Sequence, residues 1–164
     1  MRANIGVKLV VDHERQLREA LNVLKSSDVL VGVPENKKAR RGKGPSNALL
    51  AFLHNNGSPA NNLPPRPTIE PGIKDAREAE SKYMQQAAKA ALDGNTDQMS
   101  RALEACGTVA VAAVKKRIRS NTPPPLKAKT IKARRRRGVN RTNTLVDTGS
   151  YLNAHTYVVR KGKK

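Results

Sequence analysis

The chain contains very few aromatic residues and a single cysteine. Among its 164 residues there are one Phe, three Tyr, one Cys and no Trp. One cysteine excludes an internal disulfide framework. Cys106 follows Met99 and Leu103 at helical intervals, so we expect it to be a small core residue. The core must then be built from Leu, Val, Ile and Ala, whose small side chains favour closely packed helices.

Other absences exclude several classes of function. The sequence shows no cysteine and histidine spacing typical of a metal site and no Gly-Lys-Ser/Thr ending of a nucleotide loop. The three histidines, His13, His54 and His155, are scattered, and we expect surface or helix-end residues rather than ligands. No apolar run approaches the ~18 residues of a membrane span, and the N-terminus lacks the apolar core of a signal peptide. We therefore expect a cytoplasmic protein with no metal, no cofactor and no membrane partner.

Acidic residues are missing from one long stretch of a chain whose net charge is +19. No Asp or Glu lies between Glu104 and Asp147, whereas this stretch holds twelve Lys or Arg. We expect the basic segments to contact nucleic acid or an acidic protein surface, with an unengaged charged arm as the alternative. No aromatic residues interleave with them, so contact with phosphates is favoured over base stacking. The predicted contact residues are Lys37, Lys38, Arg40, Arg41, Lys43, Lys132, Arg134, Arg135, Arg136, Arg137 and Arg141.

Hydrophobic periodicity predicts one α+β domain over residues 1–164, with a small antiparallel sheet packed against a helical layer. Two long helices joined by a short turn should form an antiparallel pair within that layer. Strands are predicted at 4–11, 28–33 and 157–160, and helices at 12–26, 47–55, 72–93 and 95–120, with Asp12 as the first cap. A solvated basic loop is predicted at 35–45, an extended proline segment at 58–67 and a basic arm, outside the core, at 122–143.

The string Val-Asp-Thr-Gly-Ser at 146–150 allows two interpretations. It resembles the active-site loop of aspartic proteases, but a chain with one such motif would have to dimerise to pair two carboxylates. Those proteases are almost wholly β, whereas this chain is predicted to be more than half helical. The same string is typical of a strand-to-helix turn, in which Asp147 or Thr148 accepts backbone hydrogen bonds and Gly149 permits a tight bend. We favour the turn.

Two further segments, in order, resemble one protein family. Residues 47–58 (Asn-Ala-Leu-Leu-Ala-Phe-Leu-His-Asn-Asn-Gly-Ser) and 63–67 (Leu-Pro-Pro-Arg-Pro) resemble the signature "helix, Asn/Tyr-Gly-Ser/Thr, Ile-Pro-x-Arg-Pro-Phe" of the neck and tail-completion proteins of tailed bacteriophages. Thr68 replaces the usual Phe. Leu126, Thr130-Ile131 and residues 145–152 look like the "Pro-Leu-x-x-x-Thr" and "Leu-x-Asp-Thr-Gly-x-Leu" ending of that family. Order and spacing match over about residues 28 to 160.

The resemblance implies a non-enzymatic virion protein, assembled in the host cytoplasm, that forms a ring of six or twelve copies around the DNA channel in the neck or at the top of the tail. The implied partners are head-closure, connector or tail-terminator proteins and phage DNA. Pro64, Pro65, Arg66 and Pro67 would dock on the next subunit, where Arg66 would pair with a carboxylate, unless Arg66 caps its own helix. A free-standing basic nucleic-acid-binding protein is the second interpretation, and a homodimeric aspartic protease the third.

Overall fold

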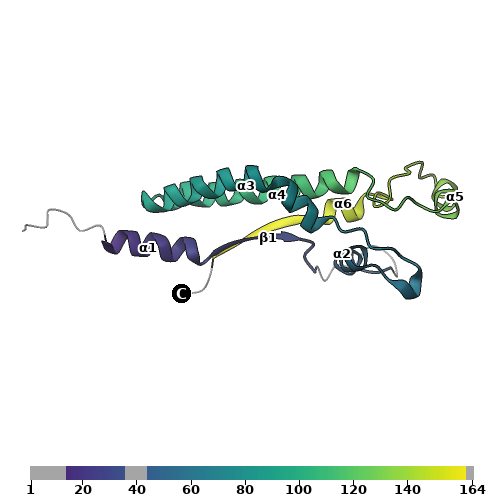
Figure 1. Cartoon of the computed structure of the whole chain (residues 1–164), viewed down its shortest axis with the longest axis horizontal. Helices are drawn as coiled ribbons and strands as arrows, with labels where there is room; N and C mark the ends of the chain where they lie inside the picture. The colour runs from purple at the N-terminus through teal and green to yellow at the C-terminus, as the bar shows by residue number, and fades with distance from the viewer. Residues whose placement is uncertain (1–13, 36–43, 162–164) are drawn as a thin grey trace, which may run out of the picture.

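The two longest helices form the spine of an elongated α+β fold (Figure 1). The computed structural model describes residues 14–35 and 44–161. Within them α3 (Ile69–Leu92) and α4 (Thr96–Arg119) lie side by side and run in opposite directions. This arrangement confirms the predicted antiparallel pair. The predicted strand at 4–11, the cap Asp12, His13 and the loop residues Lys37, Lys38, Arg40, Arg41 and Lys43 lie outside the described residues.

Small residues allow α3 and α4 to approach closely. The buried positions of α3 are Gly72, Ala76, Ala87, Ala90 and Ala91. A Cβ atom at Gly72 would lie 2.7 Å from the Cα of Val114 on α4. The helix begins at Ile69 rather than at the predicted Gly72, because Pro71 falls in the first turn, where its missing N–H is not needed.

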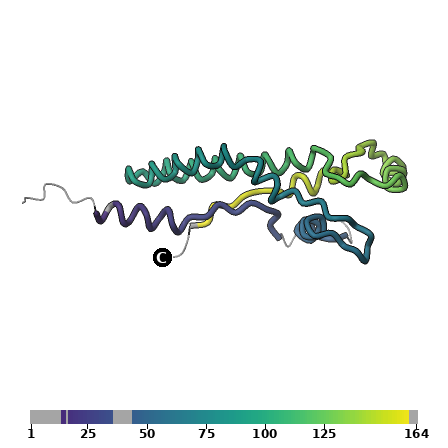
Figure 2. The backbone as a smooth tube through the Cα atoms, in the orientation of Figure 1, coloured from purple at the N-terminus to yellow at the C-terminus, as the bar shows by residue number. Residues whose placement is uncertain are grey.

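A two-stranded antiparallel sheet packs against α4. β1 (Ser27–Gly32) pairs with β2 (Thr156–Lys161), and Leu30 lies opposite Val158. α1 (Glu14–Lys25) lies in line with β1 and beside α3, with its N-terminal end nearer the α3–α4 turn (Figure 2). Helices, the sheet and their packing thus agree with the predicted α+β class.

The remaining elements lie around the other end of α4. They are α2 (Asn47–Asn56), the short 3-10 helix η1 (Pro59–Asn61), α5 (Ala128–Arg136) and α6 (Ser150–Ala154). One prediction is wrong here. The segment at 58–67 is not uniformly extended, because η1 folds it back so that Ser58 bridges Leu63. The predicted basic arm contains the helix α5, which was not among the predicted helices.

The apolar core has two parts, one at each end of the α3–α4 pair. Near the α3–α4 turn, Met99 and Leu103 pack with the alanines of α3 and with Val23 and Leu24 of α1. Toward the other end, a second cluster is made by Ala51, Val114, Ile118, Leu145, Val146, Tyr151 and Leu152. Cys106 is buried and free, as predicted. Among the described residues there is no helix long and apolar enough to cross a membrane.

Replacing Gly72 by Ala tests the close approach of the two helices. We expect Gly72→Ala to lower the free energy of unfolding by roughly 1–2 kcal/mol, because overpacking outweighs the ~1 kcal/mol that Ala contributes through helix propensity. The measurement is urea unfolding followed by circular dichroism. Gly32→Ala is the matched control, since a Cβ atom there meets nothing within 4 Å. Equal stability of the two variants would contradict the predicted overpacking.

Candidate nucleic-acid interface

The densest group of basic residues, eight Lys or Arg in 127–141, follows the C-terminal end of α4. In Figure 1, α5 stands at the end of the molecule that is farthest from α1. Lys132, Arg135 and Arg136 are exposed on α5, and their side chains make no ion pair within the described chain. Arg137 and Arg141 are also exposed. The exposed basic residues of this end are therefore placed to meet an anionic partner, as phosphate contacts require.

Arg134 differs from its neighbours, because it is buried, with 6% of its surface exposed. Its Nη1 donates to the carbonyl oxygens of Arg141 (3.2 Å), Asn143 (2.7 Å) and Val146 (3.2 Å). Its Nη2 donates to the carbonyl of Thr144 at 3.3 Å. The prediction that Arg134 contacts DNA or an acidic partner is therefore wrong. The guanidinium group instead satisfies the carbonyls of the 141–146 loop, which a buried backbone requires.

Asp147 pairs with arginines rather than with a second carboxylate. Its Oδ2 lies 3.0 Å from Nη2 of Arg137, and its Oδ1 lies 3.7 Å from Nε of Arg134. Arg141 donates to the backbone carbonyl of Asp147 at 3.1 Å. Asp147 thus links α5 to the turn, an arrangement different from the proton-sharing carboxylate pair of an aspartic protease.

The Asp-Thr-Gly string forms a turn at the start of α6. Gly149 has φ of 88°, in the left-handed region where glycine is favoured. Thr148 Oγ1 accepts a hydrogen bond from the backbone N–H of Ser150 at 3.3 Å. Of the two predicted acceptors, Thr148 therefore caps the turn, and Asp147 makes the contacts with Arg134 and Arg137. α6 leads directly into β2, so the turn lies where it can place the last strand.

A cleft of about 530 Å³ opens beside this turn. Arg119 at the end of α4 and Arg141 line it, together with polar groups of Asn143, Thr148 and Asn153. Asn143 Nδ2 donates to the carbonyl of Arg119 at 3.0 Å, which links the loop at Asn143 to the end of α4. Two guanidinium groups among amide and hydroxyl groups suit an anion such as phosphate. The sequence prediction missed Arg119, although its place in the last basic turn of α4 could have indicated it.

The proline segment is held from inside the chain by Arg66. This side chain is buried, and its Nε and Nη2 donate to the carbonyl of Pro124 at 3.0 and 2.7 Å. The backbone N–H of Arg66 also donates to the carbonyl of His54. Both predictions for Arg66, a contact across a subunit seam and a cap on its own helix, are therefore wrong. Pro65 and Pro67 are exposed and Pro64 is half-buried, so these prolines remain candidates for an interface.

Two histidines enclose the ring of Tyr151 between α2 and α6. The ring of His54 lies 5.1 Å from that of Tyr151, and the ring of His155 lies 4.7 Å from it on edge. His155 is a helix-end residue, as predicted, but it is buried rather than on the surface. Burial lowers the pKa of His54, and the charge of Arg66 lowers it further. Burial also lowers the pKa of His155, against an opposing hydrogen bond with the Tyr151 carbonyl.

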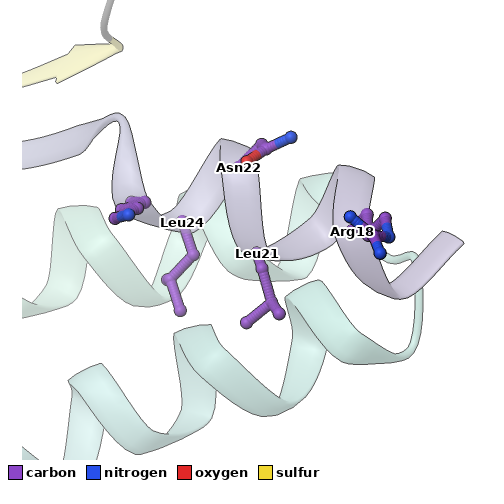
Figure 3. Close-up of a pocket in the computed structure, with 5 residues that line it drawn as sticks. Arg18, Leu21, Asn22 and Leu24 are labelled. Atoms are coloured by element: carbon purple, nitrogen blue, oxygen red, sulfur yellow. The ribbon is translucent and has the colours of Figure 1, made fainter. Parts of the chain in front are cut away.

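A separate hollow lies along α1, at the opposite end of the molecule (Figure 3). Leu21 and Leu24 point to the same side of the helix there, with Arg18 and Asn22 directed away from them. Lys25 is the fifth residue that lines the hollow, and no carboxylate or imidazole is among the five. No group of three or more His, Cys, Asp or Glu residues that could hold a metal occurs in residues 14–35 and 44–161.

No family model, curated protein or solved structure matches this chain significantly.

Replacing Arg134 tests whether its guanidinium group organises the 141–146 loop. We expect Arg134→Met to lower the free energy of unfolding by about 2–4 kcal/mol, because it leaves several buried carbonyls without a donor. Arg134→Lys should restore only part of this stability, since an ammonium group lacks the planar fork of donors. Chemical unfolding provides the measurement, with Arg135→Met as the exposed neighbouring control, expected within about 0.5 kcal/mol of the parent. Similar losses at positions 134 and 135 would refute the assigned role.

The half-buried His54 and the buried His155 predict a fall in stability at acid pH. Their pKa values are lowered from 6.5 in the folded chain, so below that pH the unfolded state binds more protons than the folded state. The stabilisation is thus present above pH 6.5 and is lost as the pH falls through the folded values. We expect the melting temperature to drop between about pH 7 and pH 5. The double variant His54→Gln, His155→Gln should melt with a weaker pH dependence, and an unchanged dependence would assign it to other groups.

Proposed function

We propose that this chain is a structural protein of a tailed bacteriophage that forms a ring around DNA at the junction of head and tail. The observation that carries the proposal is the packing of the two segments that resemble neck and tail-completion proteins. They contact each other through α2 and α6, although Asn47 and Ser150 are 103 positions apart. If the two short motifs matched the family only by chance, we would not expect them to pack against each other.

Some contacts between these segments join residues of the motifs themselves, and others involve residues directly beside them. Asn47 Nδ2 lies 3.2 Å from the hydroxyl of Ser150, which follows the Asp-Thr-Gly turn. His54 packs on Tyr151, and Thr68 lies 3.5 Å from the Tyr151 hydroxyl. Arg66, from the Leu-Pro-Pro-Arg-Pro string, binds the carbonyl of Pro124 just before Leu126. The resemblance therefore describes one packed unit, which supports a common fold with that family.

The charge distribution agrees with a ring that encloses DNA. Residues 115–141 hold twelve Lys or Arg and no acid, whereas five of the thirteen acidic residues lie in 78–104, around the α3–α4 turn. Within residues 14–35 and 44–161, the strong excess of positive charge thus lies at the end that carries α5. Copies arranged with the basic ends inward would line a channel with positive charge, and such a concentration of like charge needs an anion that stays in place. DNA phosphates provide it without base recognition.

A free-standing, sequence-nonspecific nucleic-acid-binding protein is the second candidate. The cleft between Arg119 and Arg141 favours it, because a single chain already forms this cleft and needs no second copy. The two candidates differ in assembly rather than in phosphate contact. The homodimeric protease remains the third candidate, and it alone requires peptide cleavage that Asp147→Asn abolishes.

The decisive experiment images the protein alone and in the mature particle by negative-stain and cryogenic electron microscopy. We expect a ring with six-fold or twelve-fold symmetry at the head–tail junction, with DNA passing through it. In the same preparation, DNA binding is measured as a function of salt. A monomer or a closed two-fold dimer in the particle would refute the ring. DNA binding without any ring would favour the free-standing protein.

A matched pair of triple variants shows whether the basic end meets the DNA. Lys132→Gln, Arg135→Gln and Arg136→Gln remove three exposed charges from α5 but leave Arg134 in place. Lys82→Gln, Lys89→Gln and Arg101→Gln remove three exposed charges near the α3–α4 turn. Only the α5 variant should bind DNA with a shallower salt dependence. The slope of the logarithm of the binding constant against the logarithm of the salt concentration should fall in magnitude by about 0.9 for each phosphate that the protein no longer neutralises. Normal DNA retention with impaired attachment to head or tail would assign α5 to an acidic protein partner.

A further inference from the structure

The described sheet has two outer edges that pair with no other strand of the described residues. It consists of β1 and β2 alone. Such a small sheet is marginal by itself, and each outer edge presents backbone N–H and C=O groups to a further strand. Leu30 and Val158, opposite each other, are 48% and 54% exposed, so the face turned away from α4 carries an exposed apolar pair beside the ion pair of Asp28 and Arg160.

The two edges differ in charge. β2 carries Arg160, and a basic side chain on an edge strand discourages further pairing. β1 carries one charged residue, Asp28, whose carboxylate is 2.6 Å from Arg160 across the sheet. The outer edge of β1 is therefore the less protected of the two and the more favourable for a strand that brings a positive charge.

The sequence contains one more segment with the pattern of a strand. In residues 4–11, Ile5, Val7, Leu9 and Val11 alternate with Asn4, Gly6, Lys8 and Val10. The apolar set has the period of a strand with one buried face. As a third strand, it would continue the face of β1 that bears Val29 and Val31, and Lys8 would fall on the face of Asp28.

The position of α1 limits how far this segment could reach the sheet of its own chain. α1 has 12 residues, or about 18 Å at 1.5 Å per residue, and it separates Glu14 from the start of β1. Eight extended residues span about 26 Å. If the chain turned back at residues 12 and 13, about 18 Å of the roughly 26 Å spanned by residues 4–11 would be needed to pass α1. Only about two residues of the segment would then lie beside β1 of the same chain.

We propose that residues 4–11 of one copy pair along the outer edge of β1 in a neighbouring copy, which extends the sheet to three strands across the subunit boundary. When the exchange is not reciprocal, a strand offered at one place and accepted at another makes a head-to-tail contact, and such contacts form a ring when the rotation from copy to copy closes. Backbone hydrogen bonds supply the affinity, and the alternating apolar side chains set the register. The inference rests on the proposed ring and names the contact that holds its subunits together.

Proline and threonine at position 7 test the strand pairing in the full-length protein. Val7→Pro removes a backbone donor and fixes φ, which disrupts a central pairing position, whereas Val7→Thr keeps a β-branched side chain. We expect Val7→Pro to raise the concentration for half-assembly by about tenfold or more, and Val7→Thr to change it much less. Analytical ultracentrifugation measures assembly, and the melting temperature checks that each variant is folded. Folded Val7→Pro that assembles like the parent would overturn the proposal.

Cross-linking between different chains tests whether the strand is exchanged. In a Cys106→Ala background, chains with Val10→Cys are mixed with chains with Leu30→Cys and treated with a bismaleimide, because both positions would lie on the exposed face of the sheet. We expect a covalent dimer that joins position 10 to position 30, identified by mass spectrometry, and its absence in assembled mixtures would refute the exchange. Rings that form without the cross-link would leave the proposed function standing. If the parent forms no ring in the mature particle, the proposed function itself fails.

Discussion

The close approach of α3 and α4 is the constraint on which the rest of the structure depends. Gly72 and the buried alanines bring the two backbones together, so that one face of α4 remains available for the sheet. Gly107 on that face lies against the ring of Tyr157 in β2, where a Cβ atom would collide with it. Small residues on two faces of α4 thus replace the aromatic core that the composition does not allow. A core of this kind depends on close fit rather than on large buried side chains.

Two buried arginines provide the second level of organisation. Arg66 binds the carbonyl of Pro124, and Arg134 binds the carbonyls of the 141–146 loop. A planar guanidinium group with five donors suits this role, because one side chain can satisfy several backbone acceptors. Both arginines lie in segments that look like exposed binding elements. With both of them buried, the exposed basic groups that α5 offers to a partner are Lys129, Lys132, Arg135 and Arg136.

The resulting molecule has different chemistry at its two ends. The end with α5 and the Arg119–Arg141 cleft is basic, whereas the end with α1 and the α3–α4 turn carries apolar hollows and mixed charge. The sheet lies between them, with Leu30 and Val158 exposed. A subunit of a ring needs one surface for its neighbours and another for the channel. The separation of apolar and basic surfaces along this chain meets both needs, which supports the proposed function.

The sequence alone determined the elements with strong local signals. Apolar periodicity located both long helices, the strands near 28–33 and 157–160 and the core position of Cys106, and the glycine of the Asp-Thr-Gly string marked a turn that has positive φ. These features depend on residues close together in the chain.

Only the tertiary structure decided the roles of the arginines. Arg134 and Arg135 are adjacent and chemically identical, yet one is buried against carbonyls and the other is exposed. Contacts between distant segments decide which side of α5 meets the 141–146 loop. They also decide which part of the chain Arg66 reaches and how Arg119 comes to face Arg141. Charge can be read from a residue type, whereas burial and hydrogen-bond partners follow from packing.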